Sequence, residues 1–119
     1  MFTIPVGDIL SSYAGDSKKF SFSGEIYDGY YSDLTFRKPL KFTIRIIALD
    51  DGVEVVFESL STEVVYEGTK HIIQISSFER TFKTHFDPLS DPDDIRPIEN
   101  MTIDLAPVIR EEIIIATHF

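Results

Sequence analysis

The sequence contains no cysteine. Disulfides, thiol nucleophiles and cysteine-based zinc sites are therefore excluded. No apolar run is longer than four residues, whereas a membrane-spanning helix needs roughly 20. The first ten residues, MFTIPVGDIL, include neither a basic leader nor a long apolar stretch. We therefore expect a cytoplasmic protein without a membrane partner.

Cations are scarce. Eleven Lys and Arg residues stand against twenty Asp and Glu residues, giving a net charge of -9 and a pI near 4.6. This balance argues against a protein that coats nucleic acid or an anionic membrane by bulk electrostatics, but it leaves room for a local basic patch. Hydrophobic residues make up 43% of the chain and charged residues 26%, which is typical of a soluble globular protein. We predict that residues 1–119 form a single domain.

Most of the chain alternates between apolar and polar residues with a period of two, which is typical of strands with one buried face. The clearest example is residues 41–49, whose apolar face carries Phe42, Ile44, Ile46 and Ala48. Asp51-Gly52 is the strongest hairpin signal, and the return strand extends toward Tyr66. A second turn is predicted at 67–68. The extended segment that follows, 71–86, changes phase near 76–77, which indicates a bulge or bend.

Two segments break this alternation and predict helices. Residues 8–14 predict a short N-terminal helix with Gly15 as its stop. In the C-terminal segment IDLAPVIREEIIIATHF, Asp104 is a candidate cap and Pro107 falls in the first turn. A strand from Ile113 onward stays open, because consecutive isoleucines favour β structure. The predicted fold is α+β and mainly antiparallel β: a curled sheet or open barrel with a short N-terminal helix and a C-terminal helix.

Residues 87–104, DPLSDPDDIRPIENMTID, have little periodicity and contain three prolines. Six acidic residues and one basic residue give this segment a charge of -5, which leaves -4 for the other 101 residues. We predict an acidic Pro-rich loop. Complementary charge speeds encounter and sets register, so the loop is a candidate docking surface for a cationic partner, with these docking residues: Asp91, Asp93, Asp94 and Glu99.

No catalytic or metal-binding pattern is complete. The four aspartates between 87 and 94 lack the glycine and terminal glutamate of a calcium loop, and prolines interrupt them. His71, His85 and His118 are scattered, although folding could bring two together. Ser17 follows Gly15-Asp16 without a visible base or oxyanion hole. We therefore expect a protein that is not an enzyme, with no metal, no cofactor and no small-molecule substrate.

One segment runs against the global charge. Four cations fall within nine residues that contain no acid: Arg37, Lys38, Lys41 and Arg45. Alternation places the last two on one strand face, where they are candidates for RNA phosphate contacts, and nearby Tyr30, Tyr31 and Phe36 are candidates for base stacking. The alternative is a solvated face whose cations pair with Glu54 and Glu58 across the hairpin.

The C-terminal half also carries a family resemblance. The run Pro97-Ile98-Glu99, then Ile103-Asp104-Leu105, then Arg110 to Ile114 resembles the YceD-like family of bacterial proteins. Further similarities are the Asp-Ile-Leu segment 8–10 and the hairpin centred on Gly52. The resemblance spans nearly the whole chain, and its most specific part is IDLAPVIREEI. Members of that family commonly carry Cys-x-x-Cys pairs, which this chain lacks.

The family is associated with accumulation of large-subunit ribosomal RNA. The resemblance therefore implies a non-enzymatic factor in ribosomal RNA accumulation or ribosome assembly, which acts by binding ribosomal RNA or a basic ribosomal protein. It supplies no catalytic residue. A structural or adaptor domain for protein interaction, with no RNA role, is the alternative. A hydrolase is the least favoured class, because no nucleophile, base and orienting group form a pattern.

Overall fold

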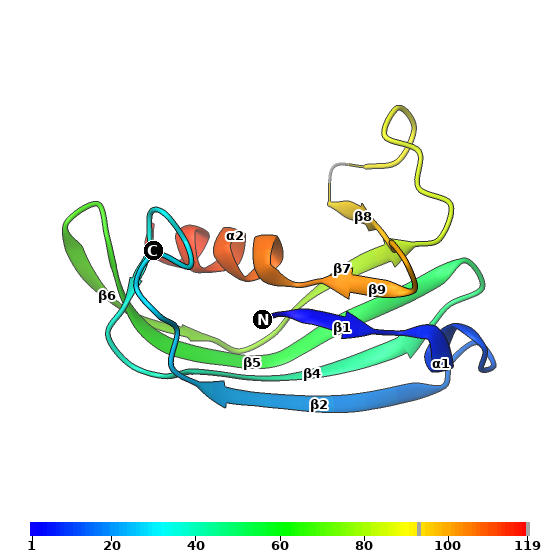
Figure 1. The fold of residues 1–119 in the computed structure, drawn as a ribbon, viewed down its shortest axis with the longest axis horizontal. Helices are drawn as coiled ribbons and strands as arrows, with labels where there is room; N and C mark the ends of the chain where they lie inside the picture. The colour runs from blue at the N-terminus through cyan, green and yellow to red at the C-terminus, as the bar shows by residue number, and fades with distance from the viewer. Residues whose placement is uncertain (93, 119) are drawn as a thin grey trace.

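The computed structural model describes residues 1–92 and 94–118. A seven-stranded curled sheet carries a small two-stranded sheet and two helices on one side (Figure 1). The elements in chain order are β1 (Thr3–Pro5), α1 (Gly7–Leu10), β2 (Ser17–Gly24), β3 (Thr35–Phe36), β4 (Leu40–Ala48), β5 (Gly52–Tyr66), β6 (Thr69–Ile75), β7 (Phe78–Lys83), β8 (Ile95–Pro97), β9 (Thr102–Asp104) and α2 (Ala106–Ala116). The predicted curled, mainly antiparallel sheet with a helix near each end is confirmed.

The fifteen-residue strand β5 organises the large sheet, whose main path is β2-β4-β5-β7-β8. Along one edge of β5 lie β4 and then β3; along the other lie β7 and then β6. The predicted phase change at Ser76 and Ser77 is the break between β6 and β7. The register continues across this break, with Ile75 opposite Leu60 and Phe78 opposite Phe57, so both strands pair with the same edge of β5.

The segment expected to be one acidic loop contains two short strands. β8 pairs in parallel with β7, and β9 pairs antiparallel with β1. The prediction of a single loop therefore missed both strands, since three-residue strands are too short to show a period of two. The parallel pair also makes the sheet mixed rather than wholly antiparallel. The N-terminal helix is shorter than predicted and ends at Leu10, before the segment expected to be helical is complete.

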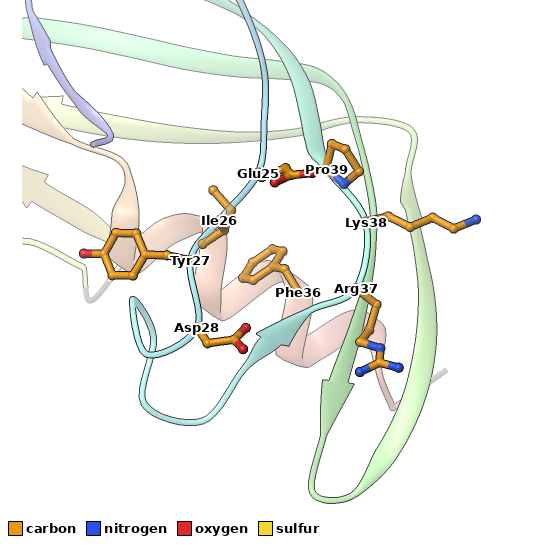
Figure 2. Close-up of a pocket in the computed structure, with 8 residues that line it drawn as sticks. All are labelled: Glu25, Ile26, Tyr27, Asp28, Phe36, Arg37, Lys38 and Pro39. Carbon is orange, nitrogen blue, oxygen red and sulfur yellow. The ribbon is translucent and has the colours of Figure 1, made fainter.

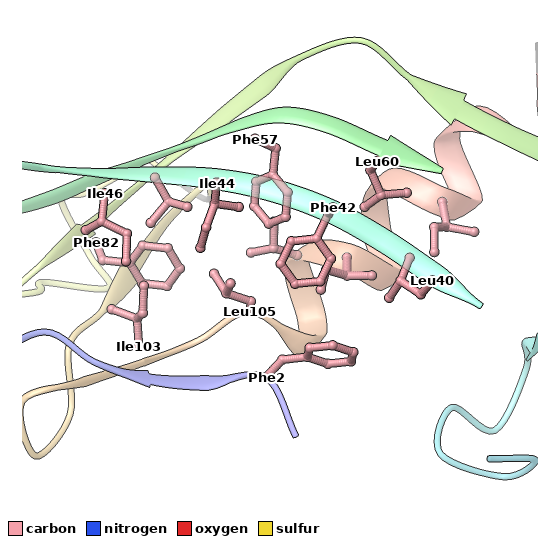
Figure 3. Close-up of a cluster of buried hydrophobic side chains, with 14 of the residues drawn as sticks. Phe2, Leu40, Phe42, Ile44, Ile46, Phe57, Leu60, Phe82, Ile103 and Leu105 are labelled. Atoms are coloured by element: carbon pink, nitrogen blue, oxygen red, sulfur yellow. The ribbon is translucent and has the colours of Figure 1, made fainter. Parts of the chain in front are cut away.

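The core lies between the large sheet and the elements that cover its inner face. These elements are α2, β1 and β9 (Figure 1). Figure 3 shows side chains from β4, β5 and β7 meeting those from the α2 side. The predicted inward face of β4 is confirmed, because Phe42, Ile44, Ile46 and Ala48 are all buried. Helix α2 contributes Val108, Ile109 and Ile113. Of the three consecutive isoleucines only Ile113 is buried; its burial and that of Ile109 contribute about 1.5–3 kcal/mol each, which favours the helix over a strand.

The start of α2 is fixed by polar contacts. The Asp104 carboxylate accepts a hydrogen bond from the Ala106 amide at 3.0 Å, close to the capping role predicted for it, and a proline lies in the first turn. The buried Tyr31 hydroxyl donates to the Ala106 carbonyl at 2.8 Å. Burial raises the pKa of Tyr31, so the phenol remains a hydrogen-bond donor.

Ion pairs hold both flanks of α2. On one flank, Glu112 pairs with Arg80 of β7 and Glu111 pairs with Arg96 of β8. On the other, Arg110 pairs with Asp33 in the connection that follows β2. The Arg-Glu-Glu run that carries part of the family resemblance therefore positions the helix over the sheet.

Candidate nucleic-acid interface

The outer face of the sheet is opposite α2 and is open to solvent. Strand alternation decides which residues reach it. On β4 these are Lys41, Thr43 and Arg45, as predicted, because the intervening residues are buried. Neighbouring strands add small polar side chains to the same face: Ser21 and Ser23 from β2, and Ser59 and Ser61 from β5.

The strand register places a further cation in this face. Lys19 of β2 lies directly opposite Arg45 of β4. Its neighbour Lys18 faces the other way and pairs with Asp8 of α1, which lowers the pKa of Asp8 chiefly through the hydrogen bond from Lys18. We call Lys19, Lys41 and Arg45, with the hydroxyl residues between them, the outer basic surface. The only sequence signal for Lys19 was its position among the polar residues that alternate with Phe20 and Phe22. This position becomes informative once the pairing of β2 with β4 is known.

An acidic residue at a β-bulge lies beside these cations. The β4–β5 register shifts between Thr43 and Ile44, so Glu58 has no partner on β4. Glu58 continues the outward phase of Glu54 and Val56, and the bulge brings Ser59 to the same face. Its carboxylate lies 3.4 Å from the Lys19 Nζ and 3.5 Å from an Arg45 guanidinium nitrogen.

The predicted pairing across the hairpin is thus present for Glu58 but not for Glu54, which faces Ile47. Both Glu58 contacts are long, and the Glu58 oxygen nearest Arg45 makes no hydrogen bond. Exposed pairs of this geometry contribute about 0–1 kcal/mol. In residues 1–92 and 94–118 no carboxylate pairs with Lys41, Arg37 or Lys38. Lys41, Arg37 and Lys38 therefore remain available to an external anion, while Lys19 and Arg45 share Glu58.

Arg37 and Lys38 lie just before the start of β4, in the short connection from β3. Both are exposed, and the Arg37 amide donates to the Glu63 carbonyl at 2.7 Å, which anchors the connection to β5. They border a cavity of about 380 Å³ whose lining also includes Tyr27 and Glu25. Figure 2 shows Lys38 extending away from this cavity, toward solvent. The four predicted cations therefore follow β4 from its start toward its centre.

The aromatic residues expected to stack on bases pack in or against the core. Tyr31 is 8% exposed, and Tyr30 and Phe36 are half-buried against the core. Tyr30 packs edge-on against Phe2 and Tyr31. Burial therefore argues against stacking by Tyr31, while Tyr30 and Phe36 are partly exposed and Phe36 lines the cavity beside Arg37 and Lys38, so stacking by these two stays a prediction. An anion on the outer basic surface would meet cations and hydroxyls.

The predicted acidic docking residues are spread over separate environments. Asp91 is largely buried; it accepts from the Asp87 amide at 2.9 Å and from Lys83 at 3.0 Å. Both contacts lower the Asp91 pKa, the backbone one most. Asp94 and Glu99 are exposed, and Asp93 lies outside the described residues. Two solvent-facing carboxylates thus remain in the described part of this docking surface.

The three histidines do not build a metal site. His71 and His118 line the same cavity of about 200 Å³ beside Tyr66 and Glu67, so folding brings these two histidines together. His85 is exposed elsewhere. Within the described ranges, no cluster of three or more His, Asp or Glu residues has metal-binding geometry.

Neither helix in the described part of the chain has the length and hydropathy required to span a bilayer. Comparison of the sequence and fold with protein-family models, curated proteins and solved structures gives no match.

Proposed function

We propose that the protein is a non-catalytic RNA-binding factor that acts in the accumulation of large-subunit ribosomal RNA. The observation that carries the binding activity is the outer basic surface, where Lys19, Lys41 and Arg45 stand among serine and threonine hydroxyls. Lys, Arg, Ser and Thr are the side chains that commonly contact phosphate oxygens. The ribosomal context rests on the resemblance of the C-terminal segment to YceD-like proteins.

Charge distribution supports contact through one face only. The chain carries a net charge of -9, so most other surfaces repel a polyanion, while the outer basic surface attracts it. Contacts to phosphates position RNA without reading bases, and the buried Tyr31 ring cannot stack on a base. We therefore expect weak sequence discrimination and affinity that falls with salt.

A salt titration with paired variants tests this proposal. The probe is a fluorescent single-stranded RNA oligonucleotide, with a fragment of large-subunit ribosomal RNA as a second ligand. Lys19→Gln and Lys41→Gln should each weaken binding and reduce the slope of log affinity against log salt by about one. Lys18→Gln is the matched control, because Lys18 neighbours Lys19 but faces α1. Equal losses for Lys18→Gln and Lys19→Gln would contradict the proposed face.

Glu58 provides a test with the opposite sign. Its carboxylate faces Lys19 and Arg45 and repels a phosphate placed between them. Glu58→Gln should therefore strengthen RNA binding, while Glu54→Gln, one row away and facing Ile47, should change it less. Weaker binding by Glu58→Gln would show that the carboxylate organises the site.

The ribosomal role is tested separately in cells. Deleting the gene should lower mature large-subunit RNA relative to small-subunit RNA, and the Lys41→Gln/Arg45→Gln double variant should fail to restore the ratio. An unchanged ratio after deletion would remove the ribosomal assignment and leave RNA binding in vitro intact.

A second candidate function is docking of a basic protein, with no RNA contact. The exposed carboxylates of Asp94 and Glu99 favour it. Pull-down from lysate with and without ribonuclease separates the two. Loss of ribosomal components after ribonuclease supports RNA contact, while persistence supports a basic ribosomal protein. Recovery of neither supports an adaptor domain outside the ribosome.

A further inference from the structure

The strands β2, β8 and β6 each have an edge without a strand partner in the described residues, and these edges differ in how well they are protected against pairing with another chain. β2 carries Lys18 and Lys19 at one free edge, and β8 is three residues long and ends in Pro97. Charged residues, short length and proline all discourage edge-to-edge pairing. β6 has seven residues, TKHIIQI, with no proline and a single lysine near its start. In the described part of the chain it pairs only with β5, so its other edge has no strand partner.

An apolar side chain stands at the middle of this edge strand. Ile72 is 79% exposed, which is unusual for an isoleucine in a strand. A groove of about 580 Å³ runs beside it, between β6 and the end of α2, with Gln74, Glu112 and Ile115 in its lining. Ile115 is itself 47% exposed. Unpaired backbone and exposed apolar surface therefore coincide at one place, which is the arrangement used for strand addition.

We propose that β6 is a homodimer interface, in which a second copy of this chain adds its own β6 antiparallel to the first. A local two-fold axis at Ile72 makes the pairing self-complementary. Ile72 then faces Ile72 of the second copy, and Lys70 faces Gln74 of the second copy. The symmetric register keeps the two Lys70 side chains apart, so no like charges stand directly opposite each other.

The electrostatic surroundings of the edge favour this register further. Glu63 of β5 lies opposite Ile72 of β6, so the second copy's Lys70, which is diagonal to Ile72 in this register, approaches an acidic side chain of the first. A contact made by one pair of strands is small compared with the roughly 1,200–2,000 Å² that stable interfaces bury. Each copy also carries a charge of -9, which opposes association at low salt. Dimerisation should accordingly depend on protein concentration and strengthen with moderate salt.

A dilution series measured by light scattering tests the dimer. The wild-type mass should rise from 13.6 kDa toward twice that value as concentration increases. Ile72→Lys should keep the monomer mass throughout, because it sets two lysines opposite each other. Leu89→Lys is the matched control: Leu89 is 96% exposed but lies far from β6 in the sequence, so this variant should dimerise like wild type. A wild-type protein that stays monomeric at every concentration and salt would overturn the proposal.

Mixing two variants tests the register itself. Ile72→Glu alone should also remain monomeric, while an equimolar mixture of Ile72→Lys and Ile72→Glu should form a heterodimer. Only a contact between the two copies of residue 72 predicts this rescue. Retention of the dimer by Ile72→Lys, or a mixture in which both variants stay monomeric, would refute the β6 register. Because Ile72 is exposed, both variants should keep the wild-type circular dichroism spectrum.

Discussion

The Arg110 guanidinium on α2 forms a two-pronged ion pair with the Asp33 carboxylate, with 3.1 Å between Arg110 Nε and Asp33 Oδ1. The two residues are 77 positions apart in the chain. The pair holds one flank of α2, while Arg80 and Arg96 hold the other through Glu112 and Glu111. Orientation of the helix therefore depends on charges that lie on both sides of its axis.

The ion pairs on the two flanks of α2 should contribute unequally to the free energy of unfolding. Asp33→Asn should lower the free energy of unfolding by about 0.2–1 kcal/mol, since the pair is partly exposed and screened by solvent. Glu112→Gln should cost more, because the Arg80 and Glu112 side chains are only 16% and 14% exposed and Arg80 would lose its counter-charge. Urea unfolding of both variants measures the difference. A larger loss for Asp33→Asn would contradict this ranking.

Stability should fall in acid. In the folded chain the pKa of Asp33 is lowered chiefly by the Arg110 hydrogen bond, that of Asp87 by Ser90, and that of Asp91 by the Asp87 amide. The stabilisation is complete above their ordinary value of 3.8. It is lost as the pH falls below that value through the lower folded-state pKa. Urea unfolding at stepped pH values should show this decline, and Asp33→Asn should flatten it.

Tyr31→Phe should isolate the hydrogen bond that anchors the start of α2. The variant keeps the buried ring and removes only the hydroxyl that donates to the Ala106 carbonyl. A loss of about 0.5–1.5 kcal/mol is expected, read from the urea midpoint. Tyr27→Phe is the control, because Tyr27 is 64% exposed. Equal effects of the two changes would show that the hydroxyl contributes nothing specific.

Ile109 should be the anchor of α2. Its side chain is fully buried, so Ile109→Ala should cost about 2–5 kcal/mol, and Ile109→Asp should unfold the domain because it buries an unpaired charge. Ile115→Ala, on the exposed side of the same helix, should change stability by about 0.5 kcal/mol or less. Thermal melts give the comparison. A near-native melt for Ile109→Asp would refute the packing of α2 on the sheet.

Gly52 should be intolerant of any side chain. A Cβ there would lie 2.0 Å from the Phe82 carbonyl oxygen, so Gly52→Ala must push β5 away from β7. Overpacking of this kind costs about 1–3 kcal/mol. Gly7→Ala is the matched control, because its nearest neighbour is the flexible Met101 side chain at 3.4 Å. Amide exchange should show the loss of protection confined first to the β5–β7 pairing.

The sequence was most informative where one period dominates. The alternation of β4, the Asp51-Gly52 turn and the apolar stripe of α2 were all predictable, because each is a local property of consecutive residues. The short strands β8 and β9 could not be predicted, because their pairing partners are distant in the chain and three residues cannot establish a period. The β3 strand is two residues long and could not be predicted for the same reason.

The candidate site was predictable only in part. Residues on one strand, such as Lys41 and Arg45, share a face by alternation alone. Lys19 joins them only through the β2–β4 register, whereas Glu58 shares their face by alternation along β5. The fate of Tyr31 depended on tertiary packing as well, because nothing local distinguishes an aromatic ring that stacks on a base from one that fills the core.

The pairing of β1 with β9 has a consequence for synthesis of the chain. Thr3 lies opposite Asp104 and Pro5 opposite Thr102, so β1 stays unpaired until β9 has been synthesised. Until residues 102–116 leave the exit tunnel, the inner face of the sheet is uncovered and its isoleucines and phenylalanines are open to chaperones. Pairing of β1 with β9 should therefore be a late step of folding, because the two strands are far apart in the chain.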